Sequence, residues 1–163
     1  MVFAIDPGNI QSAYVWLNDD LSIREFAKKD NEYVLNAFEN YVALSDTNSN
    51  VKVAIEMIAC YGQRVGKEVF ETCVYIGQLK QICRQYGVIP KFIYRKEEME
   101  VLCNGQNNGD SGIRRVLIER FAKHDLKNGK GTKKNPDFFY GFAKDIWAAM
   151  AVAITYHDKY LGE

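Results

Sequence analysis

The chain has 163 residues, of which 47% are hydrophobic and 26% are charged, so we expect a single globular domain over residues 1–163. No apolar run is long enough to cross a bilayer, and the first residues lack the pattern of a signal peptide. We therefore expect no membrane association and a cytoplasmic location. The net charge is zero, yet residues 113–134 carry eight basic and two acidic side chains. Such a segment is either a surface that faces nucleic-acid phosphates or a solvated loop.

The cysteines and histidines predict no soft-metal site. The cysteines include no Cys-x-x-Cys pair, and neither histidine lies near a cysteine or at metal-binding spacing from the other. We therefore expect buried free thiols, at Cys60, Cys73, Cys83 and Cys103.

The start of the chain predicts three strands and then a helix. An apolar run at Val2–Ile5 ends at the turn residues 6–9, which indicates a buried strand. Ala13–Leu17 and Ile23–Ala27 predict two further strands separated by a polar turn, so the three strands form a meander. Asp30 can cap a helix in which apolar residues recur at helical spacing.

The middle of the chain alternates strands and a helix. Val51–Ile58 is an apolar run that predicts a fourth strand. A long helix is predicted over residues 67–87, with Phe70 and Val74 on a broad apolar face that we expect to be buried. Ile89–Tyr94 then predicts a fifth strand.

The last third of the chain predicts three helices. A short helix covers Glu97–Leu102, and another runs from the loop at Asn104–Gly109 to about Phe121. Lys123–Pro136 is a polar segment that we expect to be mobile, and an alanine-rich helix follows over about 142–160. A meander followed by alternating strands and helices predicts an α/β fold, with a mixed five-stranded sheet and helices on both faces.

Two carboxylates interrupt the predicted buried strands. Asp6 closes the first strand and Glu56 lies in the fourth, and each follows a small residue on the same face, Ala4 or Ala54. Burying an unpaired carboxylate costs on the order of several kcal/mol, so an acid beside a buried run needs a reason. Asp145, in the first turn of the last helix, joins the two acids if the first and fourth strands are adjacent and that helix crosses their ends.

Three converging carboxylates would bind a hard cation, Mg²⁺ or Mn²⁺, because such ions prefer oxygen ligands. Cations of this kind activate water for phosphodiester hydrolysis. Two of the acids also have an ordinary structural explanation, since Asp6 can start the Pro-Gly turn and Asp145 can favour a helix N-terminus through the macrodipole. Glu56 is the hardest to explain in this way, because glutamate is unfavourable in strands.

Four motifs resemble those of the RuvC family of Holliday-junction resolvases, particularly its shorter phage-type members. Ala4–Gly8 resembles the family's Ile-Asp-Pro-Gly signature, Ala54–Glu56 its Ala-Ile-Glu strand, and Tyr75–Gln78 the Leu-Gly-Gln of its central helix. Ala143–Asp145 and Ala149–Thr155 together resemble its last helix. The resemblance implies a ribonuclease-H-like fold and a crossover junction endodeoxyribonuclease, located in the host cytoplasm if the chain is phage-encoded.

The chain departs from this family at two places. The family carries two acids three residues apart on its last helix, whereas here the pair is Asp145 and Ala148. This difference leaves open whether one or two metal ions bind, and whether Asp137 compensates. An aromatic residue that follows the strand glutamate by three residues in some members is Ala59 here, and Tyr61 is the nearest substitute for stacking on an unpaired base.

The resemblance further implies a homodimer whose two active sites cut opposing strands of branched DNA, a four-way junction. Basic residues near the carboxylates and on the polar segment would contact backbone phosphates, with surface solvation as the alternative. Together with Tyr61, the predicted DNA-binding residues are Arg64, Lys67, Arg95, Lys96, Lys130, Lys133 and Lys134.

Three other functions stay open on the sequence alone. The segment Ile-Asp-x-Gly-Asn also resembles the phosphate-binding start of actin-like ATPases, but these need two such domains, which 163 residues do not supply. The chain is alternatively a catalytically weak junction-binding protein, or a ribonuclease-H-like nuclease that acts on RNA.

Overall fold

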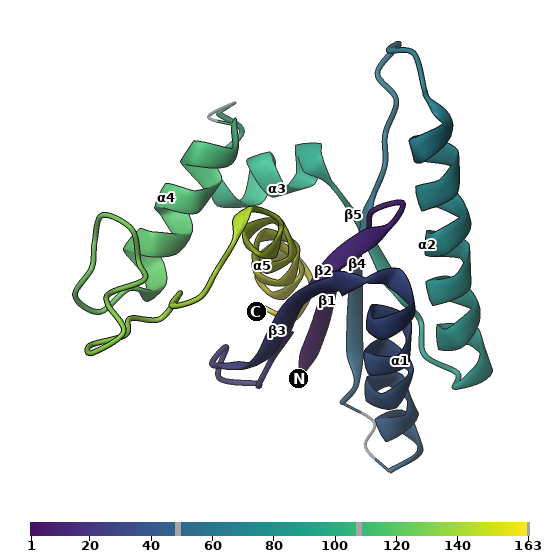
Figure 1. The fold of residues 1–163 in the computed structure, drawn as a ribbon, viewed down its shortest axis with the longest axis horizontal. Helices are drawn as coiled ribbons and strands as arrows, with labels where there is room; N and C mark the ends of the chain where they lie inside the picture. The colour runs from purple at the N-terminus through teal and green to yellow at the C-terminus, as the bar shows by residue number, and fades with distance from the viewer. Residues whose placement is uncertain (48–49, 107–108, 163) are drawn as a thin grey trace.

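The computed structural model describes residues 1–47, 50–106 and 109–162. A five-stranded sheet in the order β3-β2-β1-β4-β5 lies at its centre (Figure 1). The strands are β1 (Val2–Asp6), β2 (Gln11–Leu17), β3 (Ile23–Asp30), β4 (Lys52–Met57) and β5 (Lys91–Tyr94). The first three form an antiparallel meander, whereas β4 pairs parallel to β1 and β5 pairs parallel to β4. The sheet is therefore mixed, as the sequence predicted.

Helices cover both faces of this sheet (Figure 1). They are α1 (Asn31–Val42), η1 (Ala43–Asp46), α2 (Lys67–Gln85), α3 (Arg95–Leu102), α4 (Gly109–Phe121), α5 (Lys144–Tyr156) and η2 (His157–Leu161). Alternation along β1 divides its side chains between two hydrophobic cores. Phe3 and Ile5 pack with α1 and α2, whereas Val2 and Ala4 pack with α3, α4 and α5.

α5 lies directly against the sheet because its inner side chains are small. Ala149 and Ala153 are fully buried, and the helix contacts β1 and β2. The α-helix begins at Lys144 and ends at Tyr156, and η2 continues it to Leu161, so the helical segment starts slightly later than predicted and ends close to the predicted end. In the ranges that the structure describes, no helix combines the length and the apolar character needed to traverse a bilayer.

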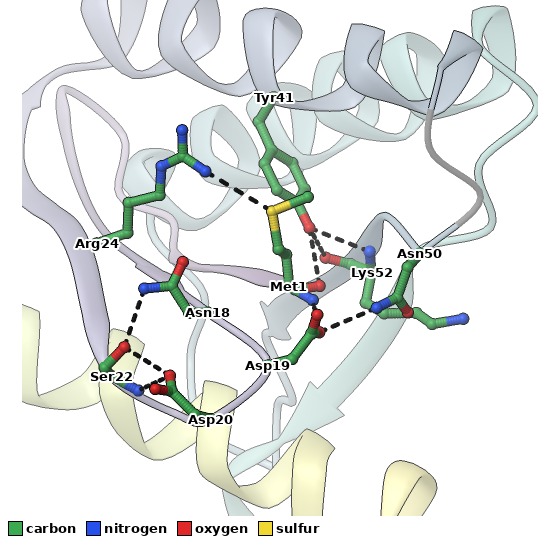
Figure 2. Close-up of polar contacts among 9 residues, drawn as sticks. All are labelled: Met1, Asn18, Asp19, Asp20, Ser22, Arg24, Tyr41, Asn50 and Lys52. Carbon is green, nitrogen blue, oxygen red and sulfur yellow. Dashed lines mark hydrogen bonds and ion pairs between the residues drawn. The ribbon is translucent and has the colours of Figure 1, made fainter.

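Figure 2 shows a hydrogen-bond cluster that joins the starts of β1 and β4. The hydroxyl of the buried Tyr41 lies within donating distance of the carbonyl oxygens of Met1 (3.0 Å) and Lys52 (2.9 Å), and it accepts from the backbone N–H of Lys52 at 3.1 Å. The Met1 ammonium pairs with Asp19, whose carboxylate also accepts from Asn50 at 3.0 Å. These contacts fix the two parallel strands at one end, and so fix which residues stand side by side at the other.

α2 exposes part of the face that the sequence predicted to be buried. Its buried residues are Thr72, Tyr75, Ile76, Leu79, Ile82 and Cys83. Phe70 and Val74, by contrast, are 62% and 67% exposed. The prediction was wrong here because the apolar stripe is wider than the surface that α1 and the sheet cover. Cys73 is exposed on the same helix and Cys60 is exposed as well, so the expectation of buried free thiols holds only for the other two cysteines.

Candidate active site

Asp6 and Glu56 end two neighbouring parallel strands. In the register of β1 and β4, Ile5 lies beside Ile55, and each acid is the next residue along its strand. Because the two strands run in the same direction, both carboxylates emerge at the same edge of the sheet. They alternate onto the face where Ala4 packs with α5. The adjacency of the first and fourth strands is thus confirmed.

The third carboxylate arrives on α5. Asp145 lies in the first turn of this helix. Together with Asp6 and Glu56 it lines an open cavity of about 570 Å³, a size typical of binding sites. Ala148, one helical turn further on, lines the same cavity. The structure therefore brings the three predicted acids around one space, with a methyl group where the family resemblance would place a fourth acid.

Asp6 and Glu56 are mostly buried and form a hydrogen bond with each other. Burial raises the pKa of Asp6 to about 9, and the charge and hydrogen bond of Glu56 and the charge of Asp145 act in the same direction. Burial also raises the pKa of Glu56, against the hydrogen bond with Asp6 and the charge of Arg95. Near neutral pH the pair therefore holds a proton between its carboxylates unless a cation takes its place.

Asp145 forms an ion pair with Lys28 of β3. The hydrogen bond and the charge of Asp145 raise the pKa of Lys28, so the lysine stays positively charged at neutral pH. Lys28 stands opposite Ala13 of β2, which stands opposite Asp6, so lysine and acid project from the same face. The sequence patterns did not single out this residue. Its signal was the alternation along β3, which puts Lys28 on the side of the core residue Phe26.

A further carboxylate, Glu98 of α3, lies near the cavity without lining it, whereas Asp110 of α4 lines it. One of its oxygens accepts from Arg95 at 2.5 Å, and within the described part of the chain the other, buried oxygen has no hydrogen-bond partner. Burial and the charge of Glu56 raise the pKa of Glu98 to about 8, against the opposing charge of Arg95. Arg95 also pairs with Asp110 of α4, so two acids hold it at the cavity wall. The sequence signal for Glu98 was its place one turn before the buried Leu102.

The acids of the cavity fit a hard divalent cation. Asp6 and Glu56 present oxygen ligands that repel each other in a largely buried place, and positive charge removes that repulsion. Across residues 1–47, 50–106 and 109–162, no three His, Cys, Asp or Glu side chains are already arranged to hold one ion, and Asp145 is paired with Lys28 instead. Asp137 does not line the cavity and cannot supply the missing ligand, because its carboxylate binds backbone N–H groups.

Some of the basic side chains line the cavity that holds the acids, and others lie outside it. Arg95 and Lys130 line the main cavity, together with Arg114, which the sequence analysis did not single out. Arg95 also lines two smaller cavities beside Tyr61, one of which includes Lys96. The remaining predicted DNA-binding residues are exposed outside these three cavities, namely Arg64, Lys67, Lys133 and Lys134.

The basic loop after α4 is held together by two aspartates. Asp137 accepts hydrogen bonds of 2.6–2.8 Å from the backbone N–H groups of Lys123, His124, Asp125 and Phe138. Asp125 accepts hydrogen bonds of 2.9–3.2 Å from the backbone N–H groups of Asn128, Lys130 and Gly131. The segment that we expected to be polar and mobile is thus organised around two internal carboxylates.

Trp147 of α5 forms part of the cavity wall. The guanidinium of Arg114 lies over its ring, 4.6 Å from the centroid, and its other neighbours include Phe139, with ring centroids 4.5 Å apart. This cation–π contact holds Arg114 at the wall. The second tryptophan, Trp16, packs on the opposite face of the sheet, with Arg24 over its ring at 4.3 Å.

Comparison with known proteins bears on the fold. No protein-family model and no curated protein sequence matches the chain. A structure of T. thermophilus RuvC in complex with a Holliday junction substrate is similar to it, with a TM-score of 0.62 and 12% identity over 95% of this chain and 90% of that chain. A second Thermus thermophilus RuvC structure has a TM-score of 0.59 and 15% identity over 95% of this chain and 92% of that one. The likeness confirms the predicted α/β, ribonuclease-H-like fold, with its mixed five-stranded sheet and helices on both faces.

Proposed function

We propose that the protein is a divalent-metal-dependent endonuclease that cleaves Holliday junctions and related branched DNA by phosphodiester hydrolysis, as one nuclease domain over residues 1–163. The side-by-side placement of Asp6 and Glu56, on a cavity shared with Asp145, is the observation that supports it most. The structural likeness to a RuvC solved with a Holliday junction substrate supports branched DNA as the substrate class.

Asp6, Glu56 and Asp145 are the residues that would hold Mg²⁺ or Mn²⁺. When bound, a cation there activates water and offsets the negative charge that develops on the scissile phosphate. The protein contributes a largely buried position for Asp6 and Glu56, in which charges act more strongly than in bulk water. Glu98 and Asp110 contribute by holding Arg95 at the wall, ready to bind a phosphate oxygen.

DNA would enter over the basic side of the cavity. Arg95, Arg114 and Lys130 line the cavity and would bind the phosphates that flank the scissile bond. Tyr61 is 70% exposed beside the acids and, with Lys96, would receive an unpaired base and its phosphate. The outer basic residues would follow the junction arms, where shape sets much of the selectivity, through Arg64, Lys67, Lys133 and Lys134.

We also propose that two copies pair through α2. Phe70 and Val74 form an exposed apolar stripe on this helix, and Gly77 has no neighbouring atom within 4 Å of where a side chain would begin. A stripe of this kind is buried when the same surface of a second copy covers it. Such a dimer carries two cavities, which suits symmetric cutting of opposing strands in a four-way junction.

A cleavage assay tests this function with a synthetic four-way DNA junction, a linear duplex and an RNA–DNA hybrid, each in Mg²⁺, Mn²⁺ or chelator. We expect metal-dependent cleavage with preference for the junction. Asp6→Asn, Glu56→Gln and Asp145→Asn should each slow cleavage by at least about 100-fold while binding the junction nearly as wild type does. Asp46→Asn, at an exposed acid on η1, is the matched control and should cut normally.

The other functions are separate outcomes of the same assay. Tight junction binding without cleavage in either metal would identify a catalytically weak junction-binding protein. Preferential cutting of the RNA–DNA hybrid would identify a nuclease that acts on RNA. Undiminished junction cutting by all three carboxylate variants would overturn the active site proposed here.

A further inference from the structure

A lysine stands at the edge of the acidic cluster. Lys28 of β3 is ion-paired with Oδ2 of Asp145. The strand register places Lys28 opposite Ala13 and Ala13 opposite Asp6, so one row across the sheet runs from the lysine to the first acid. Side chains of directly opposed residues point to the same face, and Ala13 contributes only a methyl group between the two.

Lys28 is paired directly with one of the three acids that we propose as metal ligands. Four carboxylates line the cavity, but Asp110 is paired with Arg95, which leaves Asp6, Glu56 and Asp145 to hold metal. Ala148 lines the cavity where a further acid would reach it. Glu98 does not line the cavity, and it is paired with Arg95. Three carboxylates are neutralised by one divalent cation and one ammonium group, and Lys28 supplies that ammonium beside Asp145.

We propose that Lys28 is a catalytic residue that takes the place of a second metal ion, an inference that rests on the proposed nuclease function. Nζ has three N–H donors, so two are left after the contact with Asp145 to bind oxygens of the scissile phosphate. As water attacks phosphorus and the bond to the departing ester oxygen breaks, the fixed charge of Lys28 stabilises that oxygen. The oxygen takes its proton from solvent, so Lys28 keeps its own.

The neighbouring residue provides a matched control. Lys29 is exposed, carries the same charge and alternates to the other side of β3. Its Nζ lies 5.9 Å from the centroid of the Tyr33 ring. The side chain of Lys28 is itself 41% exposed, so its replacement by methionine removes no core packing. Circular dichroism melts of Lys28→Met and Lys29→Met verify that both variants fold.

The number of bound metal ions is measured without catalysis. Wild-type protein is titrated with Mn²⁺, and free Mn²⁺ is followed by electron paramagnetic resonance. We expect one tightly bound ion per protomer. The double variant Lys28→Met/Ala148→Asp, which exchanges the lysine for a fourth acid, should bind two. Two tightly bound ions in the wild type would overturn the role of Lys28.

Cleavage of pre-bound junction under single-turnover conditions and saturating Mn²⁺ measures the catalytic role. Lys28→Met should slow cleavage about 100-fold with nearly unchanged junction affinity, whereas Lys29→Met should cut as wild type. Lys28→Met/Ala148→Asp should regain at least tenfold over the single variant, since a second ion then replaces the ammonium. Wild-type cleavage by Lys28→Met, alongside an inactive Asp6→Asn, would overturn this inference and leave the nuclease intact. Wild-type protein that cuts no junction would overturn the proposed function itself.

Discussion

The carboxylate of Asp137 accepts a hydrogen bond from the backbone N–H of Asp125 at 2.6 Å. The carboxylate of Asp125 in turn accepts one from the backbone N–H of Lys130 at 3.2 Å. This nested pair fixes a loop whose Lys130 lines the main cavity. The position of a proposed DNA-contacting lysine thus depends on two acids that point into the loop.

Asp137→Asn should weaken junction binding on the order of tenfold, the loss expected for one or two phosphate contacts. Asparagine replaces one accepting oxygen with an N–H₂ group, so some backbone N–H groups of the loop lose their partner. Fluorescence anisotropy with a labelled junction measures the affinity, and Asp46→Asn serves as the control. An unchanged affinity in Asp137→Asn would show that the loop does not present Lys130 to DNA.

Asp6→Asn should stabilise the metal-free protein at alkaline pH. The pKa of Asp6 is raised from 3.8 to about 9, so between these values the folded protein keeps a proton that the unfolded chain releases. Asp6 therefore contributes fully to stability below about pH 4, and this contribution decreases as the pH rises to about 9. At about pH 8 in chelator, Asp6→Asn should raise the free energy of unfolding by on the order of 2 kcal/mol.

Urea denaturation at a series of pH values measures this difference. The advantage of Asp6→Asn should shrink as the pH is lowered, because the wild-type carboxyl then becomes neutral too. A wild-type protein whose stability does not fall between about pH 5 and about pH 8, relative to Asp6→Asn, would contradict the raised pKa.

Tyr41→Phe should cost about 1–3 kcal/mol of stability, because it leaves the backbone groups of Met1 and Lys52 without their shared partner. Chemical denaturation measures the change. Tyr86→Phe is the control, since the contact of that hydroxyl with Glu39 is long, at 3.5 Å, and its loss should change stability little. If both variants lost the same stability, the hydrogen-bond cluster at the start of β1 and β4 would contribute no more than the long contact of Tyr86.

Phe70→Glu should convert a dimer into a folded monomer. The charge would be placed in the centre of the proposed α2 interface, where an unpaired carboxylate is strongly unfavourable. Sedimentation velocity measures the mass, and the dimer dissociation constant should rise at least about 100-fold. Ile89→Glu, at a residue that is 92% exposed and lies outside α2, should leave the dimer intact. Sedimentation of the wild-type protein as a monomer at high concentration would contradict the proposed pairing through α2.

The sheet and its acidic edge could be predicted from sequence because buried strands leave an apolar signature and acids that interrupt it stand out. Asp6 and Glu56 were found in this way, and the strand register then places them side by side. Lys28 could not be identified as the partner of Asp145, because the two are far apart in the chain. Their contact depends on strand order and on where α5 crosses the sheet.

Two further features lay beyond local patterns. The basic loop has the composition of a solvated segment, but its order comes from backbone N–H groups that bind Asp125 and Asp137, and no periodicity reveals such contacts. The exposed stripe of α2 has the pattern of a core face. Whether such a face is covered depends on the surface offered by α1 and the sheet, so Phe70 and Val74 could not be told from core residues.

The stacking of Arg114 on Trp147 gives the cavity its own optical signal. A phosphate that draws the guanidinium away from the indole changes the electric field at the ring and therefore the wavelength of its fluorescence. Trp16, on the opposite face of the sheet, can be removed as Trp16→Phe so that a single emitter remains. Occupied and empty cavities should then emit at different wavelengths, so that arrival of the proposed DNA substrate could be timed in an unlabelled protein.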